Sequence, residues 1–278
     1  MDDDAVAVAG AKIVRAAIIH LPPRRHGMRV ADLVESLLGT PTQRLRSRHI
    51  SGYYITCDLR DGVQRSLFYR GTYEPVTSGL VTAALGGGDT FLDVGANAGH
   101  YTFLAAREVG ASGHVHAIEA NPSTAQVLAD DVSWNALTDV VSVHNLAAFD
   151  RSSRLPLYVK DGPSPIGMCS IRPSQGSRAV EHVDAMPLDE LLPDAEPAVI
   201  KVDVEGADFR ALSGMRRMIE RSRPRLVVVE AEDEQLRRFG DSTQELKSYM
   251  RRVGYSSKPI DEPFHPKSLA FVRSTPES

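Results

Sequence analysis

Carboxylates stand at the ends of two apolar runs, and they are the residues best suited to chemistry. Asp203 and Glu205 lie at the end of the run at 198–204, and Glu230 ends the run at 225–230. Side chains alternate along a strand, so Asp203 and Glu205 start on one side of it. Carboxylates at one rim can act as a general base, bind a substrate amine or hold a divalent cation such as Mg²⁺. Asp203 and Glu230 are therefore candidate metal ligands.

A glycine-rich segment, Asp93-Val-Gly95-Ala-Asn97-Ala-Gly99-His100, stands where a strand at 91–94 ends and a helix begins. Glycines there let the backbone pass close to a ligand outside the carboxyl ends of the strands. The Gly-x-Asn-x-Gly spacing misses the Gly-x-Gly-x-x-Gly pattern of a pyrophosphate site. A negative charge at Asp93 would repel a pyrophosphate but tolerate a sulfonium or an ammonium.

Glu119 ends the next apolar run, at 114–118. A carboxylate in this place suits a bidentate hydrogen bond to the two ribose hydroxyls of a nucleoside. The alternative is a simple interaction with the dipole of the helix that begins beside Asn121. Lys201 has a similar alternative, because an ion pair with Asp203 or Glu205 would explain it as well as catalysis does.

Three histidines are candidates for proton transfer from an acceptor. His100 adjoins the glycine-rich segment, whereas His182 and His265 lie in segments expected to cover an acceptor. The residue types and spacings leave open which of them, or which carboxylate, is the base.

Composition excludes several classes of protein. The chain has 278 residues, a formal net charge of −4 and a sequence pI near 6.1, which argues against a nucleic-acid partner. Its two cysteines are far apart and indicate neither a disulfide framework nor a zinc site. The N-terminal apolar stretch lacks the pattern of a signal peptide, and no run is long enough to cross a membrane. We therefore expect a cytoplasmic protein.

The first 80 residues read as an appended unit. Helical spacing predicts helices at 5–19 and 30–38, and Asp61-Gly62 between the runs at 53–59 and 63–69 predicts a β-hairpin. This unit, residues 1–80, is expected to cap the acceptor site or to form a homodimer.

From residue 81 to 278 short apolar runs alternate with helical segments. Strands are predicted at 91–94, 114–118, 140–144, 198–204 and 225–230, with two more within 255–272. Asn121, and Ser242 with Glu245, provide helix caps. Alternating strands and helices predict an α/β domain with a mostly parallel sheet covered on both faces. The Pro-, Gly- and Ser-rich stretch at 151–187 is expected to be an irregular lid over the acceptor.

An ordered set of motifs across residues 71–255 resembles the FkbM family of S-adenosylmethionine-dependent methyltransferases. The motifs are Gly71-Thr-Tyr-Glu-Pro75, Phe91-Leu-Asp-Val-Gly-Ala-Asn-Ala-Gly-His-Tyr-Thr102, Ile118-Glu-Ala-Asn-Pro122, Leu188-Asp-Glu-Leu191, Ile200-Lys-Val-Asp-Val-Glu-Gly-Ala-Asp208 and Arg223-Pro-Arg-Leu-Val-Val-Val-Glu230.

The resemblance implies a Rossmann-like class I methyltransferase fold with a seven-stranded sheet. It also implies S-adenosylmethionine (SAM) as cofactor, S-adenosylhomocysteine as product and a hydroxyl of a small molecule, such as a sugar, as acceptor. The cofactor-binding residues that it implies are Glu74, Asp93, Gly95, Asn97, Gly99, Glu119, Ala120, Ala147 and Asp203. Asp93 to Gly99 would cradle the methionine part, Glu119 would hold the ribose, and 145–148 would border the adenine. Catalytic candidates are Asp203, Glu205, His100 and His182.

Three other functions remain open from the residues alone. An NAD(P)-dependent oxidoreductase shares the ribose-binding glutamate but not the glycine spacing. A methyltransferase acting on a macromolecule is a second possibility, and a cofactor-binding subunit that has lost catalysis is a third.

Overall fold

The structure is a computed structural model, and it describes residues 3–19, 26–160, 169–173, 175–262 and 268–274. Its helices are α1 (Asp3–Ile19), α2 (His26–Leu38), α3 (Gly62–Arg70), α4 (Pro75–Ala84), α5 (His100–Val109), α6 (Pro122–Trp134), α7 (Leu188–Leu191), α8 (Asp208–Gly214), α9 (Arg216–Ser222), α10 (Asp233–Arg237) and α11 (Thr243–Arg252), with a 3₁₀ turn at Gly110–Ser112. Its strands are β1 (Leu45–Arg48), β2 (Tyr54–Cys57), β3 (Thr90–Val94), β4 (His114–Glu119), β5 (Val141–Asn145), β6 (Ala147–Ala148), β7 (Ser153–Lys160), β8 (Cys169–Ser170), β9 (Ser177–Met186), β10 (Val199–Val202), β11 (Leu226–Glu230), β12 (Tyr255–Pro259) and β13 (Ser268–Arg273).

The centre of the molecule is a seven-stranded sheet in the order β12-β13-β11-β10-β3-β4-β5. The strands from β11 through β5 pair in parallel, and β13 runs antiparallel to both of its neighbours. The chain therefore starts in the middle of the sheet at β3, extends to β5 on one side and returns through β10 to the other. Ligands of such sheets bind beyond the carboxyl ends of the strands where the order reverses, here at β3 and β10. The predicted seven-stranded, mostly parallel sheet is confirmed.

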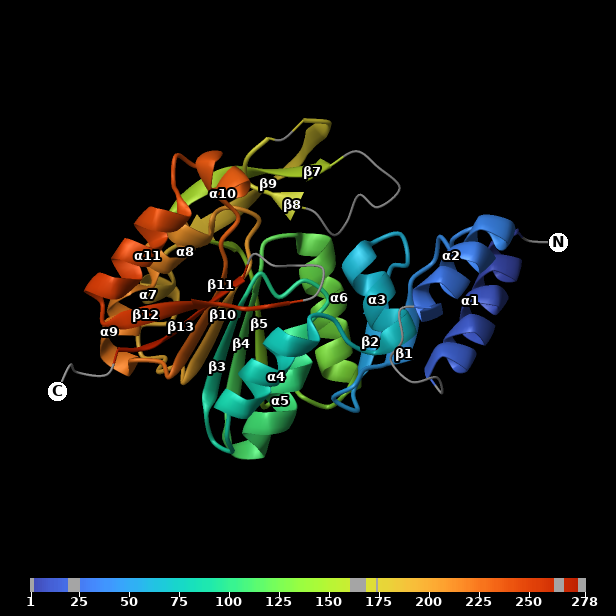
Figure 1. Ribbon diagram of the computed structural model, residues 1–278, viewed down its shortest axis with the longest axis horizontal. Helices are drawn as coiled ribbons and strands as arrows, with labels where there is room; N and C mark the ends of the chain where they lie inside the picture. Colours follow the sequence, from blue (N-terminus) through green and yellow to red (C-terminus); the bar gives the residue numbers. More distant parts are fainter. Residues whose placement is uncertain (1–2, 20–25, 161–168, 174, 263–267, 275–278) are drawn as a thin grey trace.

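Helices cover both faces of this sheet (Figure 1). On one face Phe103 of α5 and Leu128 of α6 pack with Val115 and other strand residues. On the other face Leu212 of α8 and Leu246 of α11 pack in a second cluster. Strands buried on both faces are apolar at every position, which explains the unbroken run Leu226-Val-Val-Val229.

Side-chain caps begin two of these helices at the residues that the sequence indicated. Asn121 accepts hydrogen bonds from the backbone N–H groups of Ser123 and Thr124 at the start of α6. Ser242 accepts from the backbone N–H of Glu245, whose carboxylate in turn accepts from the Ser242 hydroxyl, at the start of α11. These interactions depend only on neighbours in the chain, so local sequence suffices to predict them.

The stretch expected to be an irregular lid contains ordered strands, so the expectation that it is irregular was wrong. β7 and β9 pair antiparallel with a bulge between Leu157 and Tyr158, and they form a four-stranded sheet in the order β6-β9-β7-β8. Leu157, Val183 and Ala185 alternate with polar neighbours and form a small core of their own. Pro, Gly and Ser in this stretch concealed the alternation, which spans only the two longer strands.

The hairpin expected around Asp61-Gly62 is also wrong. Asp61 caps helix α3 by accepting a hydrogen bond from the backbone N–H of Gln64 at 2.7 Å. The antiparallel hairpin lies earlier, where β1 pairs with β2. An Asp before a helix and an Asp in a two-residue turn look alike in sequence, because both use the same short acceptor side chain.

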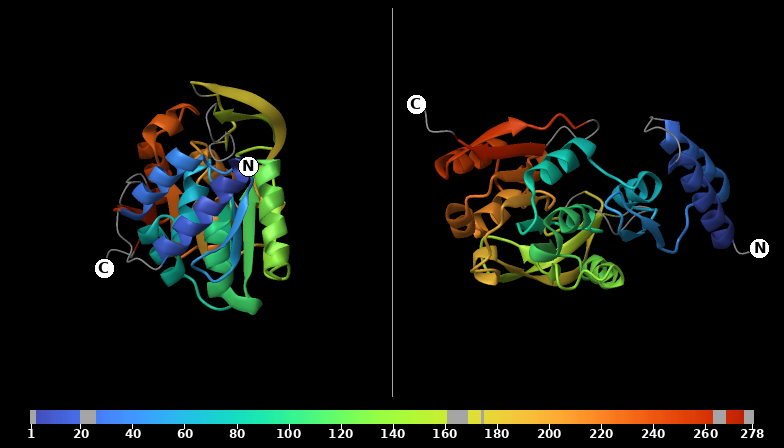
Figure 2. Two further views of the ribbon diagram at one scale, coloured as in Figure 1. Left: turned by 90° about the vertical axis from the view of Figure 1, so that its right-hand side faces the viewer. Right: turned by 90° about the horizontal axis from the view of Figure 1, so that it is seen from below.

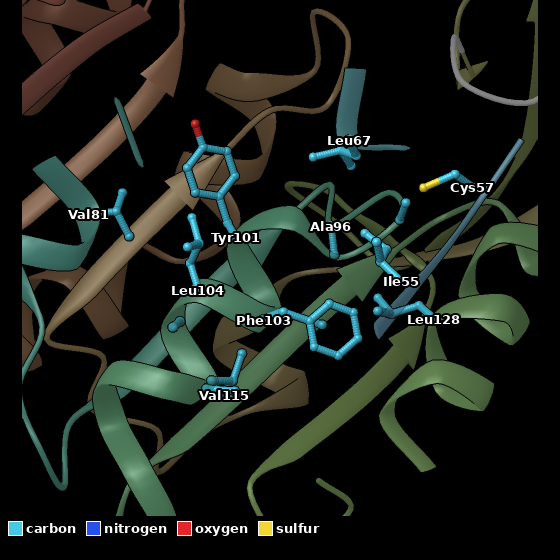
Figure 3. Packing of buried hydrophobic residues seen from close by; sticks show 14 of the residues in the cluster. Ile55, Cys57, Leu67, Val81, Ala96, Tyr101, Phe103, Leu104, Val115 and Leu128 are labelled. Carbon is cyan, nitrogen blue, oxygen red and sulfur yellow. The ribbon is translucent and has the colours of Figure 1, made fainter. Parts of the chain in front are cut away.

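The segment before the sheet, residues 3–84 in the described part of the chain, packs onto the α5 and α6 side of the domain. Ile55 and Cys57 of β2 and Leu67 of α3 contact the cluster that contains Ala96 and Phe103 (Figure 3). Helices α1 and α2 lie at the outer end of this segment, far from the sheet (Figure 2). Among the described residues, no helix is both long enough and apolar enough to span a membrane.

Candidate cofactor and acceptor site

A cavity of about 260 Å³ lies at the carboxyl ends of β3, β4, β10 and β11. Its polar walls carry Asp61, Tyr73, Glu74, Asn97, His100, Tyr101, Glu119, Asp203, Glu205 and Glu230. Its apolar walls include Leu146, Ala147, Ala148, Leu157 and Ile171. The lining residues that the structure describes carry carboxyl groups but no Lys or Arg, so the cavity favours positively charged or neutral ligands.

The glycine-rich loop after β3 forms the floor of the cavity. Gly95 has φ +87°, and a Cβ at this position would collide with the carbonyl oxygen of Asp203. Asn97 has φ 48°, and its backbone N–H donates to Oε2 of Glu119 at 2.8 Å. Gly95 is therefore required because the β3 and β10 loops touch, and the backbone of this loop is open to a ligand.

Two residues of the glycine motif lie behind the cavity wall. Asp93 accepts a hydrogen bond from Oγ1 of Thr102 at 2.6 Å and is 2% exposed. Burial raises the pKa of Asp93 to about 6. Gly99 has φ +89°, and a Cβ there would collide with Leu128. Neither residue belongs to the cavity lining, so each supports the loop rather than facing a ligand.

Glu119 ends β4 with its carboxylate held in place on both oxygens. The backbone N–H of Asn121 donates to Oε1 and that of Asn97 donates to Oε2, each at 2.8 Å. Burial raises the pKa of this carboxyl above its ordinary value, although these hydrogen bonds oppose the shift. Each carboxylate oxygen has a second acceptor site, so Glu119 can still receive two hydroxyl groups from a ribose.

Apolar residues beyond Glu119 provide a slot for a flat ring. Ala120 follows β4, and Ala147 lies on β6 beside Leu146 and Ala148. The side chain of Asn145 donates to the carbonyls of Glu119 and Ala120, at 2.9 and 3.2 Å, and ties the two loops together. The residues that the resemblance places around an adenine thus line one continuous wall.

Glu74 lies on another wall, in a tight turn before α4. It has φ 43°, is 7% exposed and accepts a hydrogen bond from Oη of Tyr101 at 2.6 Å. A non-glycine residue in this conformation is strained, and such strain often marks a functional site. Its carboxylate is a suitable partner for the amino group of a methionine moiety.

Asp203 and Glu230 meet at the ends of β10 and β11, as the parallel register requires. Nζ of Lys201 donates to Oδ2 of Asp203 at 2.9 Å, which confirms the ion pair considered for this lysine. Burial alone would lower the pKa of Lys201, but Asp203 and Glu74 outweigh it and the pKa is raised. The nearby charge of Asp203, burial and a shared hydrogen bond raise the pKa of Glu230 well above its ordinary value. The ion pair with Lys201 favours the negative charge on Asp203, and the raised pKa favours the protonated form of Glu230.

This arrangement does not support the magnesium hypothesis. The ammonium group of Lys201 already pairs with Oδ2 of Asp203 at 2.9 Å. In the described part of the chain no group of three or more His, Cys, Asp or Glu side chains is placed to hold a metal ion. The donor set fits a shared proton better than a divalent cation.

Glu205 lies in the turn after Asp203, with φ 54°. Burial, followed by the charges of Asp203 and Asp208, raises the pKa of Glu205 to about 7. Asp208 closes this turn by accepting from the backbone N–H groups of Val204 at 3.1 Å and Gly206 at 3.0 Å. The turn thus holds Glu205 at the cavity wall beside Asp203.

The three candidate histidines have different locations. His100 lines the cavity, but His49 occupies its Nδ1 and Ser78 its Nε2, each at 2.8 Å. Burial lowers the pKa of His100 well below its ordinary value. His182 lies on β9 with its side chain exposed and is not part of the cavity lining. His265 falls outside the described residues.

Several cavity residues escaped the sequence reasoning. Asp61 reaches the cavity from the start of α3, Tyr73 from the loop before α4, and Tyr101 from α5. Cys169 and Ile171 reach it from the small second sheet. Tyr73 and Tyr101 belong to recognised motifs, so their positions offered a signal. Asp61 and Cys169 carry none, because only tertiary packing brings their segments to the edge of the main sheet.

Comparisons with known proteins agree with this geometry. The family model of the methyltransferase FkbM domain matches residues 93–257, which is more than half of the chain. No match is found among curated protein sequences.

Solved structures of methyltransferases are among those similar to this chain. A methyltransferase FkbM from Methylobacillus flagellatus superposes with a TM-score of 0.51 at 18% identity, over 95% of this chain and 58% of that one. The chain therefore spans little more than half the length of that protein. A SAM-dependent O-methyltransferase from Thermotoga maritima has a TM-score of 0.44 at 14% identity, with 88% and 83% of the two chains covered. A methyltransferase from Geobacter sulfurreducens has a TM-score of 0.45 at 12% identity, with 95% and 96% covered.

The family match covers the end of β3, all of β4, β10 and β11 and the loops that follow these strands, and it includes most of the motifs by which the sequence resembles the family. The chain belongs to the FkbM methyltransferase family.

Proposed function

We propose that the protein is a SAM-dependent O-methyltransferase that acts on a hydroxyl group of a small molecule. The observation that carries this proposal is the pairing of two sites in one cavity. Glu119 with its apolar neighbours provides a nucleoside site, and Asp203 with Glu230 provides a proton-accepting site on the adjacent strands. A cofactor seated on the first would extend across the glycine-rich loop toward the second.

The residues present fit SAM. Glu119 would hold the ribose hydroxyls, and Ala120 and Ala147 would border the adenine. Glu74 would bind the amino group, since its carboxylate lies on the cavity wall beside the glycine-rich loop. When bound, SAM supplies a methyl group on a positively charged sulfur, and it leaves as the neutral thioether S-adenosylhomocysteine.

Asp203 is the group best placed to accept the proton of the acceptor hydroxyl. Its side chain is 33% exposed, whereas that of Lys201 is 1% exposed, so the cavity side of the pair is the carboxylate. Asp203 would take the proton of the acceptor hydroxyl, whose oxygen would replace the sulfur of the cofactor on the methyl carbon. Lys201 keeps Asp203 ionised beforehand, and alignment of the reactants contributes the larger part of the rate.

Calorimetric titration with S-adenosylhomocysteine tests the cofactor site directly. The wild-type protein is expected to bind this ligand and not NADH. Glu119→Ala should weaken binding by about 10- to 100-fold, because it removes hydrogen bonds to a charged group worth roughly 1.5–3 kcal/mol. Glu190→Ala, at an exposed glutamate outside the cavity, should not change it. Binding of NADH in place of the homocysteine nucleoside would overturn the proposal in favour of an oxidoreductase.

Methyl transfer from labelled SAM to a panel of sugars, nucleosides and other small hydroxyl compounds tests the reaction. We expect transfer to occur equally with added Mg²⁺ and with EDTA, because Lys201 already neutralises Asp203. Label appearing only in protein or RNA would show a macromolecular acceptor. Cofactor binding without transfer to any of these would support a subunit that has lost catalysis.

A further inference from the structure

A chain of buried hydrogen bonds connects the turn between β1 and β2 to the cavity wall. Nε2 of His49 lies 2.8 Å from Nδ1 of His100, whose own Nε2 lies 2.8 Å from Oγ of Ser78. Oγ of Ser78 donates to the carbonyl of Tyr73 at 2.9 Å. His49, His100 and Ser78 are 3%, 4% and 8% exposed. A residue of the β1–β2 turn is thereby linked to the turn that carries Tyr73 and Glu74.

The positions of the donors and acceptors assign one direction to this series of hydrogen bonds. The backbone N–H of Ser51 donates to Nδ1 of His49 at 3.2 Å, and Oγ of Ser51 lies 2.8 Å from the same nitrogen, an arrangement that favours the tautomer with no proton on Nδ1. The proton of His49 must then lie on Nε2, which makes Nδ1 of His100 an acceptor. His100 in turn donates from Nε2 to Ser78. Burial lowers the pKa of His49 to about 4, in keeping with a neutral ring.

This series of hydrogen bonds ends at a turn whose backbone is strained. Glu74 has φ 43°, and its own side chain does not cap the helix that follows it; there the backbone N–H of Thr77 donates to Oε2 of Glu262 at 2.9 Å. Ser78 supports this turn twice, since its backbone N–H donates to the carbonyl of Glu74 at 2.8 Å and its hydroxyl donates to that of Tyr73. A strained residue keeps its conformation only where the surroundings hold it. His100 is the one described ring whose nitrogen bonds the Ser78 hydroxyl.

We propose that His49 is a positioning residue for the cofactor site, and that it acts through His100 and Ser78 to hold the Tyr73–Glu74 turn. The proposal rests on the proposed function for the identity of the ligand that Glu74 meets. His49 lies outside residues 93–257, which the family model matches. The β1–β2 hairpin of this chain would thus complete the site rather than only pack against it.

The test compares two substitutions of His49. His49→Gln keeps an amide donor for His100 and a carbonyl acceptor for Ser51, whereas His49→Phe keeps ring volume without either. We expect His49→Phe to weaken binding of S-adenosylhomocysteine by at least about 10-fold, a loss of roughly 1.4 kcal/mol, and His49→Gln by less than about 3-fold. The matched control is His114→Phe, which removes a hydrogen bond to Ser142 at the other end of β4 and should leave binding unchanged.

Hydrogen exchange across residues 72–80 provides a readout that needs no ligand. His49→Phe should speed exchange of the Ser78 amide by about 10-fold, with the melting temperature and the exchange of the central strands unchanged. Equal binding and equal exchange in His49→Phe and wild type would overturn the proposal. Failure of the wild type to bind the nucleoside, with faster exchange in His49→Phe, would instead remove the proposed function and leave the positioning of the turn intact.

Discussion

Glu230 and Asp203 lie at the ends of neighbouring parallel strands, and the charge of Asp203 raises the pKa of Glu230. The charge of Asp203 favours the protonated form of Glu230, because two carboxylates in contact cannot both be ionised at low cost. Lys201, 2.9 Å from Oδ2 of Asp203, decides which of the two is charged. The pair therefore consists of an ionised Asp203 facing the cavity and a protonated Glu230 supporting it.

Substitution of these two residues should have unequal effects. Asp203→Asn removes the proton acceptor, and we expect turnover to fall by about 10²- to 10⁴-fold. Glu230→Gln keeps the shape and the hydrogen-bond donor of a group that is already neutral, so turnover should fall by less than about 10-fold. Single-turnover methyl transfer at saturating cofactor measures both. A larger loss in Glu230→Gln than in Asp203→Asn would assign the base to Glu230 instead.

The contact between Gly95 and the loop after β10 can be tested through stability. Gly95→Ala places a methyl group against the carbonyl of Asp203 at a φ of +87°, so the loops must move apart. The free energy of unfolding should fall by about 2 kcal/mol or more, and binding of S-adenosylhomocysteine should weaken as well.

Gly79→Ala is the control for this substitution. Gly79 lies within α4 with no atom within 4 Å of the added methyl group, so alanine should stabilise the protein by up to about 1 kcal/mol. Urea unfolding of both variants measures the difference. Equal effects of the two changes would contradict the contact at Gly95.

Glu205 should make stability depend on pH. Burial raises its pKa in the folded protein from 4.5 to about 7, so the native state binds this proton more tightly than the unfolded chain does. Its contribution is therefore complete below pH 4.5 and is lost as the pH rises toward 7. Glu205→Gln cannot ionise, and above pH 7 its free energy of unfolding should exceed that of the wild type by about 1–3 kcal/mol.

Urea unfolding of the ligand-free protein between pH 4.5 and pH 8 checks this expectation. Glu190→Gln, at an exposed glutamate, should reproduce the wild-type curve. If Glu205→Gln also followed the wild-type curve, Glu205 would not be the group that titrates.

The order of strands and helices in the main domain could be read from sequence because each signal is local. The unbroken apolar run within 225–230 and the caps at Asn121 and Ser242 involve only neighbours in the chain. Glu119, Asp203 and Glu230 could be placed in one site for a related reason. Parallel strands bring their carboxyl ends to the same edge, so residues that end strands must meet there.

Two sequence patterns were misread, because each of them is compatible with more than one kind of structure. Asp61-Gly62 fits a turn as well as a helix cap, and only the packing of Leu67 and Phe68 against the core decides for α3. The composition of 151–187 likewise concealed β7 and β9, whose pairing joins residues far apart in the chain.

The sequence by itself determined the family, the seven-stranded sheet and the residues at its carboxyl edge, because local pattern and chain order are sufficient for these. Tertiary structure alone decided how their charges are distributed. Lys201 pairs with Asp203, and the charge of Asp203 favours a protonated Glu230. One ring nitrogen of His100 is hydrogen-bonded to His49 and the other to Ser78. Protonation depends on burial and on distances of a few ångströms between groups that are remote in the chain, and no spacing of residues encodes those distances.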